Sequence, residues 1–208
     1  LNPFRGFLEV AAQSNGQILN YAKIAQDVGV DPHTVQTYFG ILEDTLVGFR
    51  LPSFHRSVRK RQQRHPKFYL FDTGVKRALE RALHQSLEPP TAAFGNAFEH
   101  FMILEIARLN DYFKKDYSLS YLRTKDEAEV DLILERPGDP LLLIEIKSTA
   151  QVSEREVASL ARFQPDFAGC RAFCFSLDPY PKKIGRVHCL PWPQGLKEIG
   201  LDRGERSP

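Results

Sequence analysis

The chain has 208 residues, of which 42% are hydrophobic and 26% charged, and this composition predicts one large or two small globular domains. The formal net charge of +2 is too small to indicate a nucleic-acid partner by itself. No apolar run approaches the roughly 20 residues that span a membrane, and no signal-peptide pattern opens the chain. The three cysteines do not suit a disulfide framework, so we expect reduced thiols and a cytoplasmic protein.

Residues 1–88 predict an N-terminal domain that begins with short helices. One helix covers "NYAKIAQDVGV" and stops at Gly29, and the next begins at the N-cap residue Asp31 and Pro32. Two helices joined by a tight turn are typical of a helix-turn-helix. The strand-like segments "GFRLPSF" and "KFYLF" follow, and "DTGVKRALERALHQ" reads as a closing helix. We therefore predict a winged helix.

Residues 89–208 predict a second domain after the Pro-rich linker "SLEPPTAAFG". Its elements run helix, three strands, helix and strand, followed by a final edge strand. The second helix would begin near Ser153, which has Glu156 at capping-box spacing. The predicted fold class is therefore mixed α+β, with an α-β-β-β-α-β order in the second domain.

Charges interrupt the two apolar strands of the hairpin "EVDLILERPGDPLLLIEIK". Because side chains alternate faces along a strand, Glu145 and Lys147 share one face. A turn centred on Gly138 places Asp131 opposite Glu145, about 5 Å away. The hairpin thus brings two carboxylates and an ammonium together.

Adjacent carboxylates repel each other unless a cation lies between them. Mg²⁺ prefers oxygen ligands and binds through one or two carboxylates plus phosphate. A nearby lysine can hold a phosphate or help to activate water, which is the layout for metal-assisted phosphodiester hydrolysis. Charges near strand ends also form solvated salt bridges, so the hairpin alone leaves both interpretations open.

The order of elements and the residues Asp131, Glu145 and Lys147 resemble the PD-(D/E)XK superfamily, which has the restriction-endonuclease-like fold. The resemblance implies that Asp131 and Glu145 bind Mg²⁺ or Mn²⁺, with the backbone carbonyl of Ile146 as a further ligand. It also implies that Lys147 orients or activates water, and that Glu99 in "GNAFEHF" assists. Val130 stands where this superfamily usually has proline.

A closer resemblance covers nearly the whole chain. "FGNAFEHFMILEIARL", "YLRTKDEAEVDLIL" and "LLLIEIKST" are similar to the C-terminal region of a prokaryotic family of AAA-type ATPases, in which an ATPase domain precedes a winged helix and a nuclease-like domain of poorly defined function. The chain has no P-loop motif and begins with Leu1, so we expect a fragment. ATP would then act only through the missing N-terminal ATPase domain, which would be a partner; a homo-oligomer is compatible with this resemblance.

A basic segment, "RSVRKRQQRHPK", lies between the two strands of the predicted winged helix. Its cations could contact DNA phosphates, or they could form a solvated loop or a docking surface for the ATPase. Thr34 and Gln36 would line the exposed face of the predicted recognition helix, where such side chains can read base edges. The candidate nucleic-acid-binding residues are Arg56, Arg59, Lys60, Arg61, Arg64, Thr34 and Gln36.

Two functions remain open from the sequence. The first is a metal-dependent nuclease-like domain with a DNA-binding winged helix and no membrane partner. The second is a non-catalytic module that binds nucleic acid or regulates the ATPase. Arg123 is similarly open, since it could face the acidic site or pair with Glu129.

Overall fold

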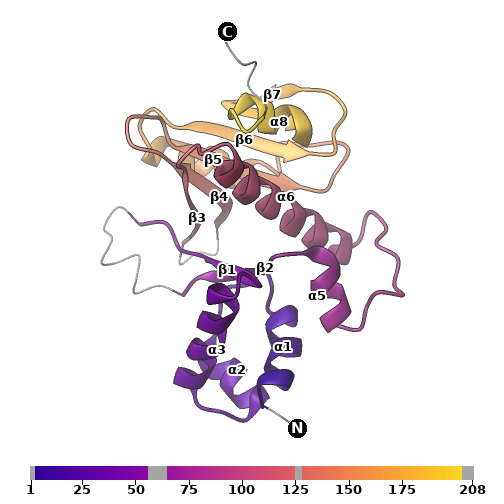
Figure 1. Ribbon diagram of the computed structural model, residues 1–208. Coiled ribbons are helices and arrows are strands. Elements are labelled where there is room, and N and C mark those ends of the chain that lie inside the picture. The colour runs from indigo at the N-terminus through magenta and orange to yellow at the C-terminus, as the bar shows by residue number, and fades with distance from the viewer. Residues whose placement is uncertain (1–2, 56–64, 125–127, 203–208) are drawn as a thin grey trace. The chain divides into compact units, whose positions relative to one another are not determined.

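The computed structural model describes residues 3–55, 65–124 and 128–202 (Figure 1). The chain divides into two compact units, residues 1–87 and 88–208, which we call the N-terminal and C-terminal units. Each unit contains helices and one sheet, which confirms the predicted mixed α+β class. No helix in the described ranges is long and apolar enough to cross a membrane.

Three helices open the N-terminal unit: α1 (Pro3–Gln13), α2 (Tyr21–Val28) and α3 (Pro32–Asp44). Helix α2 ends at Gly29, whose φ of 76° is a left-handed conformation that glycine adopts without strain. Helix α3 begins where Asp31 Oδ1 accepts a 3.0 Å hydrogen bond from the Thr34 N–H. The sequence signals for this helix pair are therefore confirmed.

A two-stranded antiparallel sheet follows, formed by β1 (Gly48–Leu51) and β2 (Lys67–Leu70). Helix α5 (Thr73–Leu79) begins after its N-cap residue Asp72, whose side chain accepts a hydrogen bond from the Val75 N–H. It is shorter than predicted, because Arg81 adopts a φ of 57° that ends the helical path. Apolar side chains of the helices and β2 form one core, which includes Phe7, Ala11, Ile24, Val35, Phe39, Leu42, Phe68 and Leu70.

The C-terminal unit is built on a six-stranded sheet with the order β3-β4-β5-β6-β8-β7. Strands β3, β4 and β5 are antiparallel neighbours, β5, β6 and β8 are parallel, and β7 runs antiparallel to β8. The strands are β3 (Ser118–Arg123), β4 (Glu129–Glu135), β5 (Leu142–Lys147), β6 (Arg171–Ser176), β7 (Lys182–Ile184) and β8 (Val187–Pro191).

The prediction that the last strand is the edge strand is wrong. Strand β8 lies between β6 and β7, and β7 forms the edge. Strand β7 has only three residues, and Lys182 and Lys183 are exposed. It therefore lacks the apolar alternation that marks a strand in a sequence, whereas lysines on an edge strand discourage pairing with other chains.

Among the described residues of this unit, three α-helices and one 3₁₀ turn accompany the sheet. Helix α6 (Ala92–Tyr112) packs on β5, α7 (Ala158–Phe163) packs on β4 and β5, and α8 (Trp192–Glu198) packs on β6 and β8. Figure 1 shows α6 and α8 on one side of the sheet, and the rings of Phe101 and Trp192 join them edge to face at 5.3 Å. The 3₁₀ turn, Gln164–Asp166, directly follows α7.

The predicted start of the second helix at Ser153 is wrong, because residues 154–157 form turns before α7 begins at Ala158. The Glu156 carboxylate does accept a 2.6 Å hydrogen bond from the Ser153 N–H, as a capping box requires. The Ser153 and Glu156 spacing therefore forms the expected hydrogen bond in a turn rather than at the start of a helix.

Candidate functional site

The hairpin of β4 and β5 has the predicted register. Leu132 pairs with Ile144 and Leu134 with Leu142, which centres the turn on Gly138. Gly138 has a φ of 89°, which suits glycine at this position. The pairing ends at Leu132 and Ile144, one residue before the carboxylates.

Asp131 continues the contact between the strands with its side chain. Its Oδ2 accepts a 2.8 Å hydrogen bond from the backbone N–H of Ile146, and the residue is only 8% exposed. Since Ile146 lies between Glu145 and Lys147 in β5, this bond fixes the Asp131 carboxylate beside both residues. The structure therefore brings together the three residues of the predicted motif.

Glu145 and Lys147 form an ion pair in which Lys147 Nζ lies 2.6 Å from Glu145 Oε1. The Glu145 side chain is 7% exposed and that of Lys147 is 33% exposed. The other carboxylate oxygen, Glu145 Oε2, is buried and has no hydrogen-bond partner among the described residues. A buried charged oxygen without a partner is costly, so it marks a place where a cation or donor would be stabilising.

Burial and neighbouring charges together shift the pKa values of both members of this pair. Burial raises the pKa of Glu145; Lys147 opposes this effect, whereas the charges of Glu99 and Glu129 add to it. Burial would lower the pKa of Lys147, but Asp131 and Glu145 more than compensate and raise it above its ordinary value. Burial is thus the main cause of the raised pKa of Glu145, whereas the neighbouring carboxylates cause that of Lys147. Because carboxylates outnumber the single ammonium, an added cation would be stabilising here.

Two further acids lie near the pair. Glu99 on α6 is half-buried, and its charge contributes to the raised pKa of Glu145; its assisting role at the site stays a prediction. Glu129 is the register partner of Arg123, and their charged groups are 3.8 Å apart. For Arg123 the structure thus supports pairing with Glu129.

The donor set fits a hard divalent cation in part. Within residues 3–55, 65–124 and 128–202, no group of three or more His, Cys, Asp and Glu side chains is arranged to hold a metal. Mg²⁺ keeps several waters and needs only one or two carboxylates, so Asp131 with the unpartnered Glu145 Oε2 satisfies the minimum. The Ile146 carbonyl stays a prediction as a further ligand.

Most of the predicted nucleic-acid-binding residues, namely Arg56, Arg59, Lys60, Arg61 and Arg64, lie outside the described residues. On α3, Gln36 is exposed, and the Thr34 hydroxyl bonds Asp31 Oδ2 at 2.5 Å as part of the helix cap. For Lys67, the last cation of the basic segment, the prediction of a phosphate contact is wrong. Lys67 is the first residue of β2 and is buried, so it is not available to a phosphate.

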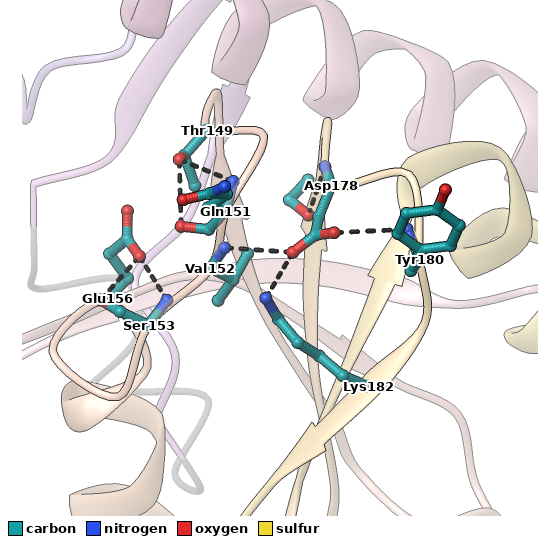
Figure 2. Close-up of polar contacts among 9 residues, drawn as sticks. Thr149, Gln151, Val152, Ser153, Glu156, Asp178, Tyr180 and Lys182 are labelled. Atoms are coloured by element: carbon teal, nitrogen blue, oxygen red, sulfur yellow. Dashed lines mark hydrogen bonds and ion pairs between the residues drawn. The ribbon is translucent and has the colours of Figure 1, made fainter.

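Asp178 and Lys182 form a further ion pair that was not predicted from the sequence. Asp178 follows β6 and is 5% exposed, and its Oδ2 lies 2.5 Å from Lys182 Nζ (Figure 2). This hydrogen bond from Lys182 lowers the pKa of Asp178. An acidic residue directly after a buried strand was the available signal, but its significance depends on a loop that is distant in sequence.

Comparisons with known proteins give families without assigned functions. Residues 1–86 match a domain of unknown function, DUF8612, and residues 94–194 match another, DUF4143. The chain is 32% identical over 142 residues to the uncharacterized proteins Mb2031c of Mycobacterium bovis and Rv2008c of Mycobacterium tuberculosis. The aligned segment covers 68% of this chain but only 31% of each relative. No solved structure matches.

Proposed function

We propose that the C-terminal unit is a metal-dependent nuclease-like domain in which Asp131 and Glu145 bind Mg²⁺ or Mn²⁺. The observation that carries the proposal is the buried Glu145, whose Oε2 has no hydrogen-bond partner in the part of the chain that the structure describes, although Asp131 and Lys147 lie beside it. A purely structural ion pair would not need a second buried carboxylate and an unpaired oxygen. The resemblance to the PD-(D/E)XK superfamily supports the same assignment.

The bound metal would supply Lewis acidity and charge stabilisation at a scissile phosphodiester. Asp131 is held in place for this role by the Ile146 N–H, which leaves its carboxylate fixed rather than free to rotate. Lys147 is one-third exposed, so its ammonium can move from Glu145 toward a phosphate or orient the attacking water. Glu99 adds negative charge that favours the cation.

The proposal also includes domains that would lie outside the aligned segment. The relatives are about three times as long as the aligned segment, and the resemblance noted above places an ATPase domain before a winged helix and a nuclease-like domain. We infer that ATP acts through such a domain and that the basic segment of the N-terminal unit contacts DNA. Three free thiols support a reducing, cytoplasmic setting.

The alternative is a non-catalytic module that binds nucleic acid or regulates the ATPase. The observation in its favour is the 2.6 Å ion pair of Lys147 with Glu145, which already neutralises part of the acidic charge. In that case Asp131, Glu145 and Lys147 would form a purely structural network. A nuclease-like fold is compatible with this, because fold alone does not determine function.

The deciding experiment measures DNA and RNA cleavage by the ATPase-containing protein with ATP and Mg²⁺ or Mn²⁺. Lys147→Ala should lower cleavage by about 100-fold or more, the cost typical of losing one group that stabilises transition-state charge. DNA affinity should stay nearly unchanged. Lys183→Ala, which removes an exposed lysine of the edge strand β7, is the matched control and should cleave normally.

Two outcomes would contradict the proposal. Equal cleavage by the wild type and Lys147→Ala would remove Lys147 from the mechanism. Absence of wild-type cleavage on single-stranded, duplex and branched substrates would favour the regulatory module.

A further inference from the structure

The segment that follows Lys147 is anchored to the neighbouring strand β6. Lys147 is the last residue of β5 and pairs with Ser176 of β6. Two residues later, the carbonyl of Thr149 accepts a 3.1 Å hydrogen bond from the Leu177 N–H. The loop then turns at Thr149–Gln151, where the Thr149 hydroxyl accepts the Gln151 N–H at 3.1 Å.

Asp178 closes this loop with a second anchor (Figure 2). Its Oδ2 accepts the Val152 N–H at 3.2 Å and the Lys182 ammonium at 2.5 Å, and its Oδ1 accepts the Tyr180 N–H at 3.3 Å. Its own N–H donates to Ser176 Oγ at 3.2 Å. A buried carboxylate with donors on both oxygens is a rigid support, because each bond restricts the orientation of the others.

Lys147 therefore lies between two buried aspartates that bind backbone N–H groups. On the N-terminal side, Asp131 holds Ile146 at the point where β4 and β5 cease to pair. On the C-terminal side, Asp178 holds Val152. Between these anchors the chain must also fit against α6, since a Cβ at Gly95 would lie 3.4 Å from Ser148 Oγ.

We propose that Asp178 is a positioning residue that fixes the loop of residues 149–152 and thereby keeps the Lys147 ammonium against Glu145. It does not touch the reacting groups itself, and it acts only through the loop. The significance for catalysis rests on the proposed nuclease function, but the positional claim does not, because it can be measured without any cleavage.

Asp178→Asn is the first variant, because it keeps the size of the side chain. An amide has one acceptor oxygen, so its NH₂ group would face either the Val152 or the Tyr180 N–H, and one hydrogen bond must be lost. Hydrogen exchange of residues 149–152 should accelerate by about tenfold or more, which corresponds to about 1.4 kcal/mol. Acylation of Lys147 by an amine-reactive ester, followed by mass spectrometry, should become several-fold faster.

Two further variants distinguish an effect of Asp178 on the position of the loop from an effect of its charge on Lys147. Lys182→Met removes the ion partner of Asp178 and changes the net charge in the opposite sense to Asp178→Asn. If Asp178 acts by positioning, both variants accelerate Lys147 acylation; if it acts through its charge alone, they shift the rate in opposite directions. Glu198→Gln is the matched control, since it breaks an ion pair with Arg171 at the other end of β6 and should leave residues 149–152 unchanged.

Unchanged exchange and acylation in Asp178→Asn would overturn the proposal. Faster loop exchange with unchanged Lys147 acylation would also overturn it, because Asp178 would then be only structural. If Asp178→Asn does not fold, as judged by circular dichroism, Asp178→Ser repeats the test with a smaller side chain. Should the wild type cleave nothing, the nuclease proposal fails while these measurements still decide the role of Asp178.

Discussion

At the scale of single residues, the site depends on how three charges share one partly buried position. Within residues 3–55, 65–124 and 128–202, Asp131 accepts a backbone N–H and Lys147 lies beside two carboxylates, whereas only one of the two Glu145 oxygens has a partner. Glu145 is therefore the least stable member of the set without a cation. The roles of the two acids can be separated, because Asp131 binds a backbone N–H whereas Glu145 is paired with Lys147 through one oxygen and keeps the other for a cation.

Substitution of Asp131 should distinguish its structural role from metal binding. Asp131→Asn keeps an oxygen that can accept the Ile146 N–H, so its stability should match the wild type while Mn²⁺ affinity falls. Asp131→Ala leaves that buried N–H without its carboxylate partner, which should lower the free energy of unfolding by about 1–3 kcal/mol. Urea denaturation and calorimetric titration measure the two effects, and equal Mn²⁺ affinity in all three proteins would remove Asp131 from the site.

Glu145 should give the folded protein a distinct pH dependence. Its pKa is raised above the ordinary 4.5, so the folded state retains the proton to a higher pH than the unfolded chain does. This difference lowers the free energy of unfolding as the pH rises from 4.5 through the raised pKa, and the full loss persists above it.

Glu145→Gln should abolish that contribution, and its stability should therefore decline less over this range than that of the wild type. Near pH 7 the variant should be as stable as the wild type, within about 1 kcal/mol. In the variant, the Lys147 ammonium still has the Asp131 carboxylate as a charge partner and is still partly hydrated. Urea denaturation at a series of pH values provides the comparison. Parallel pH curves for the two proteins would show that the Glu145 carboxyl is not perturbed.

At the scale of helices and strands, local signals predicted most elements, but non-local pairing determined the rest. Asp31 and Gly29 mark helix ends through bonds within four residues, so the sequence was sufficient there. The same-face placement of Glu145 and Lys147 followed from strand alternation. The support from Asp178 could not be predicted, because it requires the parallel pairing of β5 and β6, whose residues are about 30 positions apart.

Helix α8 illustrates another element that the sequence did not reveal. It has seven residues and packs so closely on β6 that a Cβ at Gly195 would lie 2.4 Å from Phe175. Gly195→Ala should lower the free energy of unfolding by about 1–3 kcal/mol, since the Phe175 ring must shift. Gly40→Ala in α3 is the control: a Cβ there meets nothing within 4 Å, and the change should stabilise by about 0.5–1 kcal/mol. A similar effect of the two substitutions in denaturant titrations would contradict this packing.

At the scale of the whole molecule, the proposed metal binding and the proposed DNA binding are assigned to different compact units. Every residue of the candidate metal site lies within residues 88–208, whereas the basic segment lies within residues 1–87. The proposed metal binding and DNA binding should therefore be separable by truncation.

A fragment of residues 88–208 should bind Mn²⁺ within a factor of about two of the full chain, because all the proposed ligands lie within this unit and sites without shared partners contribute independently. Its DNA affinity should be lower, and the dependence of binding on salt should be less steep by about 0.9 for each DNA phosphate that the fragment no longer neutralises. Calorimetry and salt-dependent fluorescence anisotropy test the two parts. An unchanged salt dependence would show that the N-terminal unit does not bind DNA phosphates.

The most direct test of the metal site is anomalous diffraction from crystals of the protein soaked in Mn²⁺. We expect one strong anomalous peak coordinated by the carboxylates of Asp131 and Glu145, with Glu145 Oε2 as a ligand, and no peak there in crystals of Glu145→Gln. Absence of a peak at this position in the wild type under saturating Mn²⁺, or a peak that persists in Glu145→Gln, would contradict this expectation.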